Sequence, residues 1–125
     1  MFSVIVRDHI MIAHSLPDPF FGPASQMHGA TYVVDAEFKA KELNAHNVVI
    51  DIGEAQKVLS EVLGALNYKN LDNESQFAGK LTTTEFLANH IHSQIAEVMR
   101  GTFSGILKIT LGESHVAWAS YESEM

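Results

Sequence analysis

The first 14 residues alternate between apolar and polar side chains with the period of a β-strand. A second stretch, from about residue 28 to residue 40, alternates in the same way. Because successive side chains of a strand point to opposite faces, each stretch predicts a half-buried strand, and together they predict an antiparallel hairpin. Three prolines in the connecting segment 15–25 exclude regular structure there. The apolar positions are Phe2, Val4, Val6, Ile10, Ile12, Tyr32, Val34, Ala36 and Phe38, and His14 shares their face.

The pattern then changes to the period of an α-helix. Asp51 is a predicted N-cap, and apolar side chains follow it at helical spacing up to residue 66. A polar segment of about residues 67–81 leads to a second helix, for which Thr82 and Glu85 have the spacing of a capping box and Gly101 suits the end. The apolar positions of the two helices are Ala55, Val58, Leu59, Val62, Leu63, Leu66, Leu87, Ile91, Ile95 and Val98.

Residues 106–111 and 116–121 predict two more strands joined by a tight turn. The order ββααββ predicts one α+β domain over residues 1–125, a four-stranded antiparallel sheet with two helices on one face. Such a sheet leaves two open edges and one face without a full cover. Since copies of the chain would close these edges by pairing with one another, we expect a homo-oligomer.

Composition narrows the classes of function. The net charge of −7, with only eight Lys and Arg, argues against a nucleic-acid partner. There is no apolar run long enough to span a membrane and no secretory signal at the amino terminus, so we expect a cytoplasmic protein without a membrane partner. The absence of cysteine excludes disulfides, thiolate metal ligands and a thiol nucleophile.

Two histidines are candidate metal ligands. His14 and His28 lie on the inward parity of the two paired strands, where imidazoles can bind zinc. A third ligand two residues after His28 would share its face, but that residue is Ala30. The alternative is a buried, hydrogen-bonded histidine pair. His115 is a candidate substitute ligand if its strand continues without a break.

An acidic side chain ends the apolar face of the third long strand. Glu113 continues the parity of Leu111, and a buried carboxylate requires a partner. That partner is either a basic residue of the fold or the amidine-like edge of a bound heterocycle; the alternative is a carboxylate in an exposed turn. Thr82, Thr83 and Thr84 are predicted helix caps whose NH groups also suit an anion or a ring carbonyl. His90 and His92 differ by two positions on a helix, which predicts surface residues.

Short motifs follow one another along nearly the whole chain. They are Ala13-His14-Ser-Leu, Met27-His28-Gly-Ala30-Thr-Tyr32, Val49-Ile-Asp51, Asn67-Tyr68-Lys-Asn-Leu-Asp72, Phe77-Ala, Thr83-Thr84-Glu85, Glu113 and Tyr121. Together they resemble the 6-pyruvoyl/6-carboxytetrahydropterin synthase family. The resemblance implies a T-fold whose subunits join into a barrel, as a trimer or hexamer, with pterin pockets between subunits.

The chain departs from this family at its chemical residues. Ala24 stands where the family has its cysteine, Ala30 where it has its third zinc histidine, and Asn67-Tyr68 where it has an Asp-His pair. Alanine and asparagine do not move protons near neutral pH, and a tyrosine of ordinary pKa does so poorly. The resemblance therefore implies that the usual lyase activity is absent or altered.

The binding residues match the family better than the catalytic ones do. By resemblance, Glu113 holds the amino and ring NH edge of a pterin, and Thr83 and Thr84 lie beside that ring. Two hypotheses stay open. One is an enzyme acting on a pterin or purine-like heterocycle, with Tyr68 as acid and zinc at His14 and His28. The other is a non-catalytic binding or regulatory oligomer.

Overall fold

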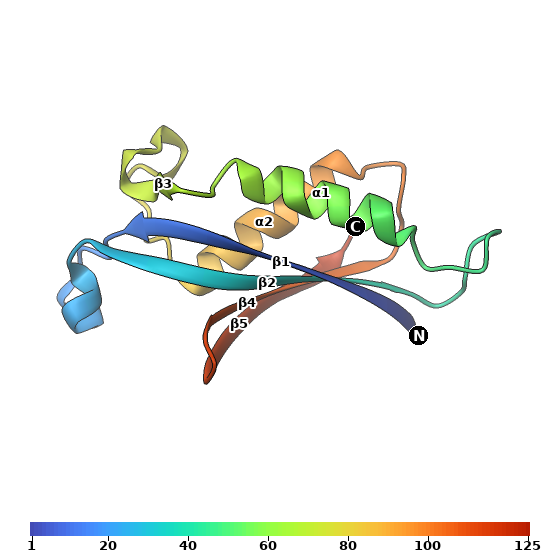
Figure 1. The fold of residues 1–125 in the computed structure, drawn as a ribbon, viewed down its shortest axis with the longest axis horizontal. Coiled ribbons are helices and arrows are strands. Elements are labelled where there is room, and N and C mark those ends of the chain that lie inside the picture. Colours follow the sequence, from blue (N-terminus) through green and yellow to red (C-terminus); the bar gives the residue numbers. More distant parts are fainter.

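The computed structural model describes residues 1–125 and contains one sheet with two α-helices on the same face (Figure 1). The strands are β1 (Phe2–His14), β2 (His28–Ala40), β3 (Lys69–Asn70), β4 (Ile106–Ser114) and β5 (Ala117–Glu124). The α-helices are α1 (Ile52–Gly64) and α2 (Thr84–Val98), and the 3-10 helices are η1 (Pro19–Ser25), η2 (Leu71–Asn73) and η3 (Ser75–Phe77). The prediction that segment 15–25 has no regular structure was therefore wrong for η1, which begins at a proline because the first NH of a helix needs no partner.

The sheet has the strand order β3-β1-β2-β4-β5. Its four long strands are antiparallel to their neighbours, as the sequence predicts. The fifth strand, β3, was not predicted: its two residues pair in parallel with Ile12 and Ala13 of β1. Two residues are too few to show a period in the sequence, so this strand has no local signal.

The β1–β2 hairpin keeps one register over its whole length, from Phe2 opposite Ala40 to His14 opposite His28. The even-numbered residues of both strands therefore face the helices, and the core lies between the sheet and the helices. The largest fully buried side chains are Tyr32, Phe38, Ile10, Leu59, Leu63, Leu66, Leu71, Leu87, Ile91, Ile95, Met99 and Leu107. The apolar pattern of the sequence thus predicted most of the core. It was wrong for Phe2 and Val98, which are exposed, and it missed Met99, which is buried at the end of α2.

The two helix starts differ in how well the sequence predicted them. Asp51 caps α1 as expected, since its carboxylate accepts a hydrogen bond from the backbone NH of Glu54 at 2.9 Å. The cap of α2 is Thr83, which accepts from the NH of Phe86 at 3.1 Å. The predicted capping box of Thr82 with Glu85 was therefore wrong by one residue. Thr82 is buried, and a tertiary contact occupies its hydroxyl instead.

The prediction that His90 and His92 are surface residues was also wrong. His92 is buried at 5% exposure and packs edge-to-face against Tyr121 of β5, with ring centroids 4.9 Å apart. His90 is half-buried against Phe77, also at 4.9 Å. His92 is buried because α2 packs against β5, and His90 is half-buried because the other side of α2 packs against the segment before the helix. A wider arc of this helix is buried than its aliphatic stripe indicates.

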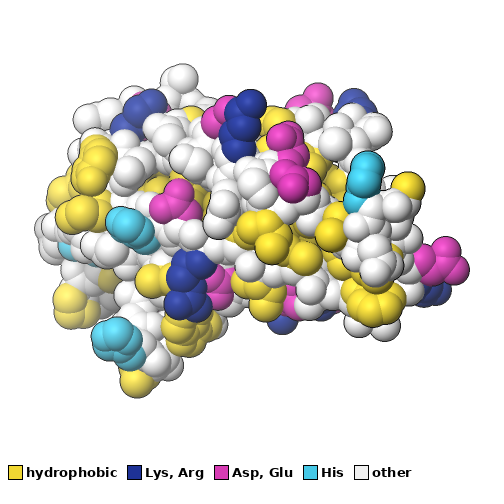
Figure 2. All heavy atoms as spheres, turned by 45° about the vertical axis from the view of Figure 1, so that its right-hand side comes forward, with side chains coloured by type: hydrophobic (Ala, Val, Ile, Leu, Met, Phe, Trp, Pro, Cys, Tyr) yellow, Lys and Arg dark blue, Asp and Glu magenta, His cyan; other side chains and the backbone are white.

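The opposite face of the sheet carries no helix. Ile5, Met11 and Trp118 are each about half exposed there, and Arg7 and Asp35 form an ion pair across β1 and β2 at 2.7 Å. Figure 2 shows hydrophobic side chains reaching the surface in groups between charged ones on the side it presents. Both edges are open: β3 covers only the end of β1, and β5 has one neighbour. None of the helices is long and apolar enough to cross a membrane.

Candidate functional site

A β-bulge positions Glu113 at the end of β4. Gly112 pairs with Trp118 and Ser114 pairs with Ala117, so Glu113 is the additional residue between two paired positions. A bulge releases one side chain from the regular alternation and redirects it. In the single chain, Glu113 is exposed and its carboxylate forms no ion pair. Glu113 thus lies at the end of β4, and its carboxylate is exposed in the single chain and not buried as one reading of the sequence predicted.

Glu113 lines a hollow of about 200 Å³ between α2 and β5. Thr84 and Glu85 contribute from the first turn of α2, and the remaining lining residues are Ala117, Trp118 and Ala119 of β5. The lining residues thus include two acidic residues, a threonine and a tryptophan, and no basic residue. Such a lining suits a ligand that donates hydrogen bonds to a carboxylate.

Tyr32 connects this hollow to the core. Its ring is buried at 1% exposure in β2. Burial raises the pKa of the Tyr32 phenol above 10.0, and the nearby carboxylates of Glu113 and Glu85 raise it further, while a side-chain hydrogen bond with Thr84 lowers it. The phenol therefore stays protonated near neutral pH. The sequence pattern gave Tyr32 only as a core residue.

Trp118 lies against a glycine. A Cβ at Gly112 would lie 2.7 Å from Cε3 of the Trp118 ring, so no larger residue fits while the ring keeps this place. The ring is 48% exposed on the uncovered face. Gly112 and Trp118 thus fix an aromatic surface immediately beside the bulge.

His14 and His28 meet at the end of the β1–β2 hairpin. Their ring centroids are 4.6 Å apart in an edge-to-face arrangement. Nδ1 of His14 lies 2.9 Å from the hydroxyl oxygen of Thr82, and Nδ1 of His28 lies 2.8 Å from the carbonyl oxygen of Gln26. Burial lowers the pKa of His14 below 6.5, and the neighbouring His28 lowers it further. The inward placement predicted for both rings is therefore present.

These donors fit a zinc ion only in part. Two imidazoles are one short of the three protein ligands of a catalytic zinc. The structure contains no group of three or more His, Cys, Asp and Glu side chains that could hold a metal ion. His115 lies in the exposed turn between β4 and β5, and its role as a substitute ligand stays a prediction.

Asn67 and Tyr68 fasten the chain after α1 to the edge of β1. The side-chain oxygen of Asn67 accepts from the NH of Met11 at 2.9 Å, and the NH of Tyr68 donates to the Met11 carbonyl at 2.7 Å. Tyr68 has a left-handed backbone (φ 62°) and is 79% exposed. Ala24 lies at the end of η1, where its carbonyl accepts from the NH of Leu16 at 3.1 Å.

The sheet order separates the candidate acid from the candidate ligand-binding residue. Tyr68 lies beside β1, whereas Glu113 lies between β4 and β5. Three strand spacings correspond to roughly 14 Å between the two backbones. The structure therefore brings Glu113 together with Thr84 and Trp118, and His14 with His28, but it does not bring Tyr68 to Glu113 within one chain.

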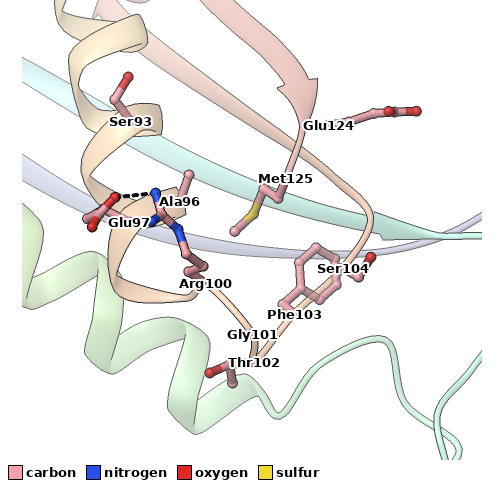
Figure 3. Close-up of a pocket in the computed structure, with 10 residues that line it drawn as sticks. All are labelled: Ser93, Ala96, Glu97, Arg100, Gly101, Thr102, Phe103, Ser104, Glu124 and Met125. Atoms are coloured by element: carbon pink, nitrogen blue, oxygen red, sulfur yellow. Dashed lines mark hydrogen bonds and ion pairs between the residues drawn. The ribbon is translucent and has the colours of Figure 1, made fainter.

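A larger hollow, of about 630 Å³, lies at the far end of α2. Figure 3 shows Arg100 reaching back along the helix to its ion pair with Glu97, while Phe103 and Met125 line the opposite side. The pair is exposed at 78% and 67%. None of the predicted site residues lines this hollow, so its size does not make it the stronger candidate.

Comparison with known proteins identifies the family and the fold. The family model described as 6-pyruvoyl tetrahydropterin synthase matches residues 3–124. The chain belongs to this family. No curated protein sequence matches it significantly.

Solved structures of 6-pyruvoyl tetrahydropterin synthases share the fold. The enzyme of Caenorhabditis elegans aligns with a TM-score of 0.85 at 21% identity, over 98% of this chain and 95% of that one. The enzyme of Plasmodium vivax aligns with a TM-score of 0.81 at 16% identity, over 99% and 98% of the two chains. A variant of the P. vivax enzyme, in which a glutamate described as a catalytic residue is changed to alanine, aligns with a TM-score of 0.80 at 15% identity, over the same shares. The predicted T-fold is confirmed.

Proposed function

We propose that this member of the 6-pyruvoyl tetrahydropterin synthase family binds a pterin or purine-like heterocycle through Glu113, and that the usual lyase activity is lost or altered. The observation that carries the proposal is the carboxylate of Glu113, which has no ion partner and lines a hollow with Thr84 and Trp118. An amino group and a ring NH side by side would satisfy its two oxygens, and such charge-assisted pairs are strong.

The position of this hollow favours a site that a second copy of the chain completes. β5 supplies half of the lining and is also an open edge of the sheet. A copy that pairs with this edge would enclose Glu113, which a single chain leaves exposed. The same pairing is a route by which Tyr68 of a neighbouring copy would approach Glu113. We therefore propose a homo-oligomer with the heterocycle between subunits. Light scattering on the purified protein measures the oligomeric state.

The altered chemistry follows from the residues at the positions of the family's catalytic groups. Ala24, Asn67 and Tyr68 provide neither a thiol nor an imidazole. The amide of Asn67 is moreover engaged with the β1 backbone. A non-catalytic binding or regulatory role explains these residues together with a retained ligand-binding carboxylate.

Catalysis without a thiol is the second candidate function. In the P. vivax relative, a glutamate is described as a catalytic residue, so a carboxylate serves catalysis in at least one protein of this fold. In this chain the exposed and strained Tyr68 is the candidate acid. Incubation with dihydroneopterin triphosphate followed by mass spectrometry separates the two candidates. Unchanged substrate supports the binding role, and release of triphosphate contradicts the proposed loss of lyase activity.

The ligand-binding proposal is tested by Glu113→Gln, which keeps the shape of the side chain and removes its charge. Fluorescence titration with pterin is expected to show a loss of affinity of about 10- to 100-fold, because hydrogen bonds to a charged group contribute about 1.5–3 kcal/mol. Glu85→Gln is the matched control, since it removes a carboxylate from the same hollow and should change affinity far less. Equal affinity of Glu113→Gln and wild type would remove the basis of the proposal.

A further inference from the structure

His14 and His28 are each held in the orientation of a metal ligand. The carbonyl oxygen of Gln26 can only accept a hydrogen bond, so Nδ1 of a neutral His28 carries the proton and Nε2 carries the lone pair. Nδ1 of His14 is likewise occupied, by the hydroxyl of Thr82. Ligating histidines are typically oriented by such a hydrogen bond on the second ring nitrogen. The two imidazole rings are adjacent, with their centroids 4.6 Å apart.

The position that would supply a third donor is Ala30. It lies two residues after His28 on the same face of β2 and pairs with Ile12, two residues before His14. A side chain at this position therefore points to the same side of the hairpin as both rings. Ala30 is only half-buried, and its methyl group has no lone pair to donate.

We propose that His14 and His28 form a pre-oriented two-ligand remnant of a transition-metal site, and that Ala30 alone prevents the chain from retaining zinc. One donor at position 30 is then sufficient to restore a three-ligand site, because the two imidazoles already lie side by side and each is held through its Nδ1. This inference goes beyond the proposed heterocycle binding and does not depend on it, since none of the three residues lines the hollow of Glu113.

The test is a metal-binding titration of the full chain. Wild type, Ala30→His and Ala30→Cys are treated with a chelator, loaded with Zn²⁺ and dialysed, and their zinc content is measured by mass spectrometry. Co²⁺ titration gives a second readout, since a restored site shows visible absorption bands. Thr31→His is the matched control, because it adds an imidazole to the adjacent residue on the opposite face of β2.

We expect substoichiometric zinc in wild type and Thr31→His, and about one zinc per chain in at least one of the two Ala30 variants. Adding His14→Ala to that variant should abolish the gain. Two results would overturn the proposal. One is stoichiometric zinc in wild type that is lost in His28→Ala. The other is no zinc in Ala30→His and Ala30→Cys when both have the circular dichroism and cooperative unfolding of wild type.

Discussion

The hydroxyl oxygen of Thr82 lies 2.9 Å from Nδ1 of His14, and this hydrogen bond joins the residue before the N-cap of α2 to the last residue of β1. Both side chains are buried, at 3% and 2% exposure. Next to this contact, the carboxylate of Asp72 accepts hydrogen bonds from the backbone NH and the hydroxyl of Ser15. The segment between the two helices is thus fixed to the end of the first strand, where His28 also lies.

Thr82→Val is expected to destabilise the fold by about 1–3 kcal/mol. Valine has the shape of threonine, but it leaves a buried imidazole nitrogen without a partner. Thr82→Ser keeps the hydroxyl and should lose less. Urea unfolding of the two variants measures the difference in the free energy of unfolding, and equal values would show that the hydrogen bond is not important for stability.

The fold is expected to lose stability as the pH falls below about 6.5, and His90 should account for part of the loss. Burial lowers the pKa of His90 below its ordinary value of 6.5. As the pH falls, the unfolded chain therefore binds the proton before the folded chain does. The contribution of neutral His90 to stability is present above pH 6.5 and is lost as the pH falls towards the pKa of His90 in the folded chain. His90→Gln should flatten the dependence of the urea midpoint on pH in this range.

Asn89→Gln is the control for His90, since it changes the neighbouring exposed position without changing a titratable group. Its pH dependence should match that of wild type. If His90→Gln also matched wild type, the proton would be bound equally well by the folded and unfolded chains, and the burial argument would fail.

Tyr68→Gly is expected to stabilise the fold by about 0.5–1 kcal/mol. Tyr68 has a left-handed backbone, which costs a side-chain-bearing residue roughly 1–2 kcal/mol, and glycine avoids most of this cost while losing some entropy. The hydrogen bond to Met11 comes from the backbone and persists. Thermal unfolding checks the sign. A lower melting temperature would show that the Tyr68 ring contributes more to packing than its backbone conformation costs.

Gly112→Ala should destabilise the chain by about 1–3 kcal/mol, since its methyl group would overlap the Trp118 ring. Trp118→Ala removes the overlap. In a double-mutant cycle, Gly112→Ala should therefore cost much less in the Trp118→Ala background than in wild type. An equal cost in both backgrounds would place the strain in the backbone of the bulge and not in the ring contact.

The sequence predicted the long strands, the helices and the core because these depend on local periodicity. Alternation over 13 residues fixes which face of β1 or β2 is buried, and one register then follows for the whole hairpin. The same parity placed His14 and His28 on the inward face. The motifs also identified the family, since they recur in order along nearly the whole chain.

The tertiary structure alone decided which side chains meet. Thr82 has the local pattern of a cap, but burial against His14 gives its hydroxyl a different partner and moves the cap to Thr83. The bulge at Glu113 depends on how β5 returns against β4, and the cover over His92 depends on Tyr121 of that same strand. Contacts between residues far apart in the chain have no period along it, so they become visible only when the elements are packed.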